Sequence, residues 1–357
     1  MEGVLSQKRT GAASLPPAEP LALWDGNSLL GRSVRFTLSL MAPILVGLML
    51  GASVWIAYAI MTCILCYMLD TGGTTLSRLR EFAIAALVVI LGAVLGTVVK
   101  GDPLLMALAL GGTAMLYGLV EGFHTNTAAC ARFLCLSVSI AALYSPIKML
   151  DVYVVIGCAI YSWALSVAWD MATGIWRPAK RPTLQQLTEY LNANKTERMV
   201  FSVITGLTVG VSFLVIQALQ LQHVNWAILA LMIVLHADVE ASWRIAKSLL
   251  IGTLVGVAAA WIYGTLFTSH AALIIGMTIA AIIRWPIQDR NGSLGQAAMA
   301  FFILLMMQLI AHLTGHPSHA PADRLIDITL GCAISFVALA INAVAQHLLR
   351  KASSRPV

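Results

Sequence analysis

The chain has 357 residues, of which 59% are hydrophobic and only 11% are charged. Soluble domains carry about 25% charged residues, so this composition excludes a soluble protein and indicates an integral membrane protein. The formal net charge is +6 at pH 7. Because the positive charges follow the predicted membrane topology, they do not require a nucleic-acid partner.

The apolar residues form long blocks of the length that a helix needs to cross a bilayer core of about 30 Å. Membrane-spanning strands would instead alternate in polarity over about ten residues, and these blocks do not alternate. We therefore predict an all-α integral membrane protein with about twelve transmembrane helices. Their expected ranges are 36–52, 54–69, 82–99, 103–121, 127–145, 151–170, 199–219, 224–238, 248–267, 270–285, 294–314 and 325–348.

The two ends of the chain are predicted to be cytoplasmic. Residues 1–33 are polar and rich in proline, which indicates a disordered arm rather than a cleavable signal peptide. With this arm inside, all of the 22 Lys and Arg residues except Lys100, Lys148 and Arg324 fall in inner segments. This distribution obeys the positive-inside rule and also places the tail at 350–357 inside.

The longest connection, residues 171–198, separates a first half at 34–170 from a second half at 199–349. This linker is basic, and Thr183 and Gln186 have the spacing of a capping box, so we predict a short helix on the inner membrane surface. It is too short to form a soluble domain.

The halves contain the same polar landmarks in the same order, which predicts two parallel six-helix repeats about an axis along the membrane normal. An arginine precedes the first span, an aspartate closes the second, and an arginine follows in the next inner loop. The third span then carries G-x-x-x-G. The corresponding pairs are Arg35 and Arg198, Asp70 and Asp238, Arg78 and Arg244, and the motifs at 92–96 and 252–256.

The acidic residues after the second spans allow two interpretations. Asp70, Asp238 and Glu240 either belong to solvated turns that cap helices, or they form a gate of paired acids and bases at the inner mouth. Their recurrence in both halves motivates the gate. His236 adds a group that titrates near neutral pH.

The arginines also allow two interpretations, because the charges that fix topology can bind an organic anion. Arg35, Arg78, Arg198 and Arg244 place positive potential at the inner mouth, where they would attract such an anion. Arg132 lies about one turn inside the fifth span, where it either snorkels to the inner face or binds the anion.

Two segments of the second half resemble the fusaric acid resistance protein-like family of aromatic acid exporters, which is related to the plant aluminium-activated malate transporters. They are HVNWAILALMIVLHADVEASWRIAKSLLIGTLVGVAAAW at 223–261 and DRLIDITLGCAIS at 323–335. The resemblance extends more loosely over 32–348. Many family members carry a large soluble domain after the first six spans, whereas this chain has only the linker at 171–198.

The resemblance implies a multi-pass exporter in the bacterial inner membrane that carries aromatic carboxylic acids or similar amphipathic organic anions. Its expected partners are the lipid bilayer, the anion, a periplasmic adaptor protein with an outer-membrane channel, and a second copy of the chain.

The sequence contains no nucleotide-binding or metal-binding motif, so we expect no cofactor and transport that uses the proton gradient. Asp70, Asp238 or Glu240 would carry the proton. The chain also lacks a clustered nucleophile and base, so we do not expect an enzyme. The alternatives are a passive organic-anion channel and a membrane scaffold subunit that transports nothing.

Overall fold

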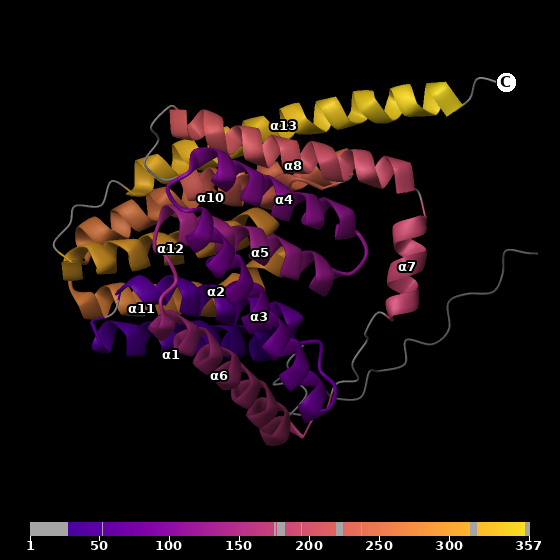
Figure 1. The fold of residues 1–357 in the computed structure, drawn as a ribbon. Coiled ribbons are helices and arrows are strands. Elements are labelled where there is room, and N and C mark those ends of the chain that lie inside the picture. The colour runs from indigo at the N-terminus through magenta and orange to yellow at the C-terminus, as the bar shows by residue number, and fades with distance from the viewer. Residues whose placement is uncertain are drawn as a thin grey trace, which may run out of the picture.

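The computed structural model describes residues 28–51, 53–174, 176, 183–193, 195–218, 224–236, 238–314 and 320–353. These residues form thirteen α-helices, twelve of which occupy the ranges predicted as spans (Figure 1). The thirteenth, α7, is the short helix predicted in the linker. The all-helical membrane class is therefore confirmed.

The first half contributes six helices. Several of them begin at side-chain caps: Ser28 accepts from the backbone N–H of Gly31, and Asp102 precedes a proline in the first turn of its helix. The bounds are α1 (Leu29–Met49), α2 (Ser53–Leu69), α3 (Thr75–Val99), α4 (Pro103–Val120), α5 (Thr125–Leu143) and α6 (Met149–Thr173).

The linker helix and the second half follow. The predicted capping box of the linker helix is present, with Thr183 and Gln186 bonding to each other's backbone. The bounds are α7 (Leu184–Asn192), α8 (Lys195–Ala218), α9 (Val224–Val234), α10 (Val239–Leu266), α11 (His270–Arg290), α12 (Gly292–Thr314) and α13 (Ala320–Ser353).

Three helices, α1, α3 and α10, begin seven to nine residues before the predicted spans, and the early starts of α3 and α10 correct the expected inner loops. Thr74 and Asp238 cap α3 and α10, so Arg78 and Arg244 lie inside helices rather than in loops. The apolar pattern reveals only the part of a helix that contacts lipid or core, and the caps start each helix earlier.

The predicted ends of the chain need the same correction. The expected disordered arm at 1–33 lies outside the described residues up to residue 27, but residues 29–33 are already helical. The expected tail at 350–357 begins inside α13, which continues to Ser353.

Ten of the helices are long and apolar enough to cross a membrane. The exceptions among the predicted spans are α2 and α9. With 11 residues, α9 measures about 16 Å at a rise of about 1.5 Å per residue, half of an average bilayer core. Its residues from Ala227 to Val234 are mostly buried against protein, so it need not cross lipid itself. The count of twelve spans stays a prediction.

The same helix pairs are packed together in both halves. α3 packs on α5 as α10 packs on α12, and α2 packs on α6 as α9 packs on α13. Between the halves, α4 packs on α8 and α11 packs on α1. This recurrence favours the predicted repeats. Their parallel orientation and the cytoplasmic termini stay predictions.

The two G-x-x-x-G motifs explain the closest of these pairs. A Cβ on Gly96 would lie 2.4 Å from the carbonyl oxygen of Val138 on α5. A Cβ on Gly256 would lie 2.7 Å from the carbonyl oxygen of Ala297 on α12. Both distances are too short for any side chain, so glycine is required for the helix backbones to approach this closely.

Candidate functional site

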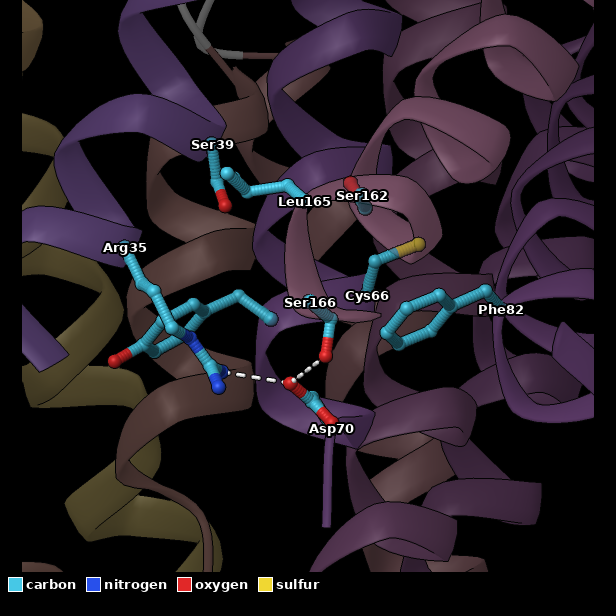
Figure 2. Close-up of a pocket in the computed structure, with 9 residues that line it drawn as sticks. Arg35, Ser39, Cys66, Asp70, Phe82, Ser162, Leu165 and Ser166 are labelled. Atoms are coloured by element: carbon cyan, nitrogen blue, oxygen red, sulfur yellow. Dashed lines mark hydrogen bonds and ion pairs between the residues drawn. The ribbon is translucent and has the colours of Figure 1, made fainter. Parts of the chain in front are cut away.

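Five polar side chains from the first half form a buried charge cluster. They lie where α1 and α3 begin and where α2 and α6 end, so the topology brings them to one end of the bundle. Figure 2 shows three of them around a small pocket. The members are Arg35 on α1, Asp70 just after α2, Arg78 on α3, and Ser166 and Asp170 on α6.

Asp70 is the centre of this charge cluster. One carboxylate oxygen accepts from Nη2 of Arg35 at 2.7 Å and from the hydroxyl of Ser166 at 2.6 Å (Figure 2). The other oxygen accepts from the backbone N–H of Gly72 at 3.3 Å. The side chains of Arg35 and Asp70 are only 5% and 1% exposed. This ion pair is therefore shielded from water.

Arg78 closes the other side of the charge cluster and is fully buried. Its Nη2 donates to Asp170, and its Nη1 donates to the hydroxyl of Ser166 at 2.8 Å. Its Nε lies 3.8 Å from the second oxygen of Asp70. Two guanidinium groups thus face two carboxylates, and this balance offsets the large cost of removing charges from water.

The pocket beside the ion pair has a volume of about 10 Å³ and is lined by Arg35, Asp70 and Ser166, with Cys66 and Phe82 on its apolar side (Figure 2). That volume corresponds to about one water molecule. An aromatic acid therefore does not fit in this conformation. Nη1 of Arg35 is buried and has no hydrogen-bond partner among the described residues.

The predicted counterparts in the second half do not come together. Asp238 caps α10 by accepting from the backbone N–H of Glu240 at 3.0 Å, and both carboxylates are exposed. Arg244 is exposed on the first turns of α10. For these three residues the structure therefore has the geometry of a capped, solvated helix start, and the predicted paired gate is absent from the described part of this half.

Arg198 contacts the linker helix instead of an acid. Its guanidinium carbon lies 3.6 Å from the centre of the Tyr190 ring, and its Nη1 donates to the backbone carbonyl of Tyr190. The Tyr190 hydroxyl in turn donates to the carbonyl of Glu121 at the end of α4. Arg198 therefore fastens α7 between α8 and α4.

Arg132 and His236 lie near each other, where α4 and α5 meet the end of α9. Nη2 of Arg132 donates to the Tyr117 hydroxyl at 2.8 Å, and that hydroxyl donates to the carbonyl of Leu235 at 2.9 Å. Burial lowers the pKa of the neighbouring His236 below its ordinary value of 6.5. His236 is therefore neutral at pH 7 and is poorly suited to carry a proton there.

Sequence reasoning missed Ser166 and Asp170. A signal for them was present, because Asp170 is the last residue of the predicted span at 151–170, as Asp70 follows the second span. Ser166 precedes it by one helical turn and so lies on the same face.

The family comparison covers the second half of the chain. The model of a family described as fusaric acid resistance protein-like matches residues 196–338, from the start of α8 into α13. No curated protein and no solved structure matches the chain. The relation to the plant malate transporters stays a prediction. Together with ten helices long enough to cross a membrane, the match supports a multi-pass membrane transporter. Residues 196–338, less than half of the chain, are thus similar to the fusaric acid resistance protein-like family.

Proposed function

We propose that the chain exports aromatic carboxylic acids, or similar amphipathic organic anions, across the bacterial inner membrane together with a proton. The observation that carries this proposal is the buried ion pair between Arg35 and Asp70. A substrate carboxylate offers the same planar acceptor as the Asp70 side chain, so it competes with Asp70 for the guanidinium. Asp70 thus acts as a tethered counter-ion that holds Arg35 until substrate replaces it.

The proton enters because Asp70 loses an opposite charge when the substrate displaces it. Losing such a neighbour in a buried place favours the protonated carboxyl. The charge cluster contains two arginines and two aspartates, so a bound anion adds one negative charge that the proton cancels. The loaded and empty sites are then both neutral, which limits the cost of buried charge during the crossing. Because the proton leaves together with the anion, this cycle is driven by the concentration gradient of the acid. It works against an inward proton gradient, whereas the sequence led us to expect transport that uses that gradient.

Proton uptake on binding tests the coupling. We would add 4-hydroxybenzoate to the purified chain in weakly buffered detergent solution and record the pH. The intact chain is expected to take up about one proton for each anion bound. Asp70→Asn should bind the anion without uptake, whereas the matched control Asp238→Asn should behave like the intact chain. If the intact chain binds the anion without taking up a proton, the proposed coupling between anion binding and protonation of Asp70 is wrong.

A passive organic-anion channel is the second candidate, and one observation favours it. After losing Arg35, Asp70 keeps the hydroxyl of Ser166, the N–H of Gly72 and the nearby Nε of Arg78. These groups favour the ionised carboxylate, so the anion would cross alone. Reconstituted chain would then carry an anion current that sets a reversal potential, whereas the proton-coupled exporter carries no net current.

We also propose that the exporter works with a periplasmic adaptor protein and an outer-membrane channel. The adaptor protein and the outer-membrane channel follow from the resemblance to exporters, as does the bacterial inner membrane. Efflux from cells by the intact chain, abolished by Arg35→Gln, is the corresponding test in the membrane. Efflux that survives neutralisation of every paired arginine, or no movement of any aromatic acid, would leave the scaffold subunit as the better description.

A further inference from the structure

A second cluster lies beside the charge cluster, where α1, α2 and α11 meet. The rings of Phe36, Tyr67 and Trp285 lie close together, with centroid distances of 5.2 Å for Phe36 and Tyr67, 5.9 Å for Phe36 and Trp285, and 5.7 Å for Tyr67 and Trp285. Arg32 and Arg284 flank them. We call these five residues the aromatic–arginine cluster.

Among the residues that the structure describes, Arg284 differs from the other arginines nearby in having no counter-charge. Arg32 pairs with Asp289 at 2.7 Å, and Arg35 pairs with Asp70. The guanidinium carbon of Arg284 instead lies 4.6 Å from the centre of the Phe36 ring and 4.9 Å from that of Trp285. Among the described residues, neither a carboxylate nor a hydrogen-bond acceptor pairs with it.

The same place holds several buried donors without acceptors. Most buried polar groups in proteins have a hydrogen-bond partner, so a group of exceptions requires an explanation. Four of the partnerless buried atoms described on α1 and α11 are N–H donors, and a fifth, Oε1 of Gln288 one turn after Arg284, is an acceptor. Among the described residues, the partnerless buried donors here are Nε of Arg32, Nη1 of Arg35, Nε of Arg284 and Nε1 of Trp285.

We infer that the aromatic–arginine cluster binds the aromatic carboxylate, with Arg284 and the Trp285 N–H holding the carboxylate and the three rings packing on the aromatic ring. A carboxylate only accepts hydrogen bonds, and it has two oxygens to share among these donors. Aromatic rings prefer offset or edge contacts with other rings at the spacing found here. The inference deepens the proposed function and rests on it.

The position of this cluster suits transport. α1 and α2 belong to the first half and α11 to the second, so an anion here would touch both halves at their contact. Arg35 lies on α1 between the two clusters, with its guanidinium 5.6 Å from the Tyr67 ring. An anion that enters at Arg284 therefore reaches Arg35 next. There it can displace the carboxylate of Asp70 from the Arg35 guanidinium.

A lipid phosphate is the competing source of an anion. The geometry favours a small molecule, because Phe36 is only 1% exposed and the side chain of Arg35 only 5% exposed. The partnerless donors are themselves buried atoms, so their acceptor must enter the protein. A phospholipid headgroup on the surface does not reach them without carrying its glycerol between the helices.

Benzoate binding to the full chain in phosphatidylcholine nanodiscs tests the inference. Arg284→Gln should weaken binding about tenfold, the effect of losing about 1.4 kcal/mol from a charge-assisted contact. Trp285→Phe retains a ring but removes the N–H, so a smaller loss of about threefold is expected. The matched control is Arg290→Gln, since Arg290 is exposed on the last turn of the same helix. It should leave binding unchanged.

Two further probes separate the contribution of the carboxylate charge from that of the aromatic ring. Benzoate should bind more tightly than cyclohexanecarboxylate, which has the charge without the aromatic face, and than benzyl alcohol, which has the ring without the charge. Equal binding of benzoate and cyclohexanecarboxylate by the intact chain would contradict the role of the aromatic rings. Unfolding temperatures of all variants show whether a loss of binding reflects a loss of fold.

The outcomes separate this site from the proposed function. Benzoate binding that depends on Arg284, without transport, would support the site and reject the exporter. Transport with an unchanged KM in Arg284→Gln would reject the site and leave the exporter. If the intact chain binds no benzoate but retains phosphatidylglycerol through Arg284, the anion is a lipid phosphate and the inference is wrong.

Discussion

In the first half of the chain, Asp70 is buried between two arginines, whereas in the second half its counterpart Asp238 is exposed and caps a helix. Asp70 directly follows α2, whereas Asp238 lies beyond the end of the equivalent helix α9 and caps the start of α10. An arginine follows each aspartate by about two turns. The sequence order alone therefore does not decide which aspartate becomes part of a site. The difference comes from the helix that packs against each of them.

In the first half, α6 presents Ser166 and Asp170 to Asp70 and Arg78. In the second half, the corresponding pair is formed by α9 and α13, which approach through a small residue. A Cβ on Gly331 would lie 2.5 Å from the carbonyl oxygen of Ala227. This contact lies near the start of α9, eleven residues before Asp238. Among the described residues, no side chain of α13 hydrogen-bonds to Asp238 or Arg244, and both are exposed.

The largest expected effect contrasts the two equivalent arginines. Arg78→Met leaves the carboxylate of Asp170 buried beside an apolar side chain, and breaking a buried ion pair in this way costs about 3–5 kcal/mol. Arg244→Met changes an exposed residue and should cost less than about 0.5 kcal/mol. Unfolding in mixed micelles at increasing dodecyl sulfate measures both free energies.

The double variant Arg78→Met with Asp170→Asn gives the control for this contrast. It removes both charges, so it should recover part of the stability that Arg78→Met loses. Equal destabilisation by Arg78→Met and Arg244→Met would contradict the distinction between the halves.

The second prediction concerns a feature that the halves share. Gly96→Ala and Gly256→Ala should each destabilise the protein by about 1–3 kcal/mol, since the new methyl group would overlap a carbonyl oxygen on the facing helix. Gly112→Ala is the control, because no atom lies within 4 Å of its Cβ position. It should gain about 0.5–1 kcal/mol from helix propensity. Different costs at Gly96 and Gly256 would weaken the argument for repeats.

Much of the fold was predictable because a bilayer imposes simple rules on sequence. Helix lengths, the charge distribution and the capping box of Thr183 and Gln186 depend on local composition, and all thirteen helices of the described residues were anticipated. The helix starts at Thr75 and Val239 were less accurate, because a cap acts outside the apolar block that reveals the span.

The site was predictable only in part. Arg35, Asp70 and Arg78 were selected from the order of landmarks, and the structure brings them together. Their partners on α6 depend on which helices pack side by side, which a single sequence does not specify. The same limit hid Arg284 and Trp285, since their α11 meets α1 across the boundary between the halves.

A third prediction separates the capping role of Asp238 from any role of its charge. Asp238→Ala removes the acceptor for the Glu240 N–H and should cost about 1 kcal/mol. Asp238→Asn keeps a side-chain oxygen at the cap, so stability and anion transport should both be retained. Loss of transport in Asp238→Asn with normal stability would return this aspartate to the candidate gate residues.

The smallest expected effect is the pH dependence contributed by His236 in the second half. Burial lowers its pKa in the folded protein below the ordinary 6.5. The unfolded chain therefore binds the proton more readily, and the stability contribution is complete above about pH 6.5 and is lost as the pH falls below it. Unfolding temperatures between about pH 7.5 and 5.5 should fall less in His236→Gln than in the intact chain.

His347→Gln is the control for this titration, because His347 is an exposed histidine on α13. It should leave the slope of stability against pH unchanged. The result also bears on transport, since a histidine that resists protonation cannot serve as the proton carrier in the neutral range. A steeper loss of stability in His236→Gln than in the intact chain would mean that His236 is charged in the folded protein. The second half would then have a candidate proton carrier, His236, as the first half has Asp70.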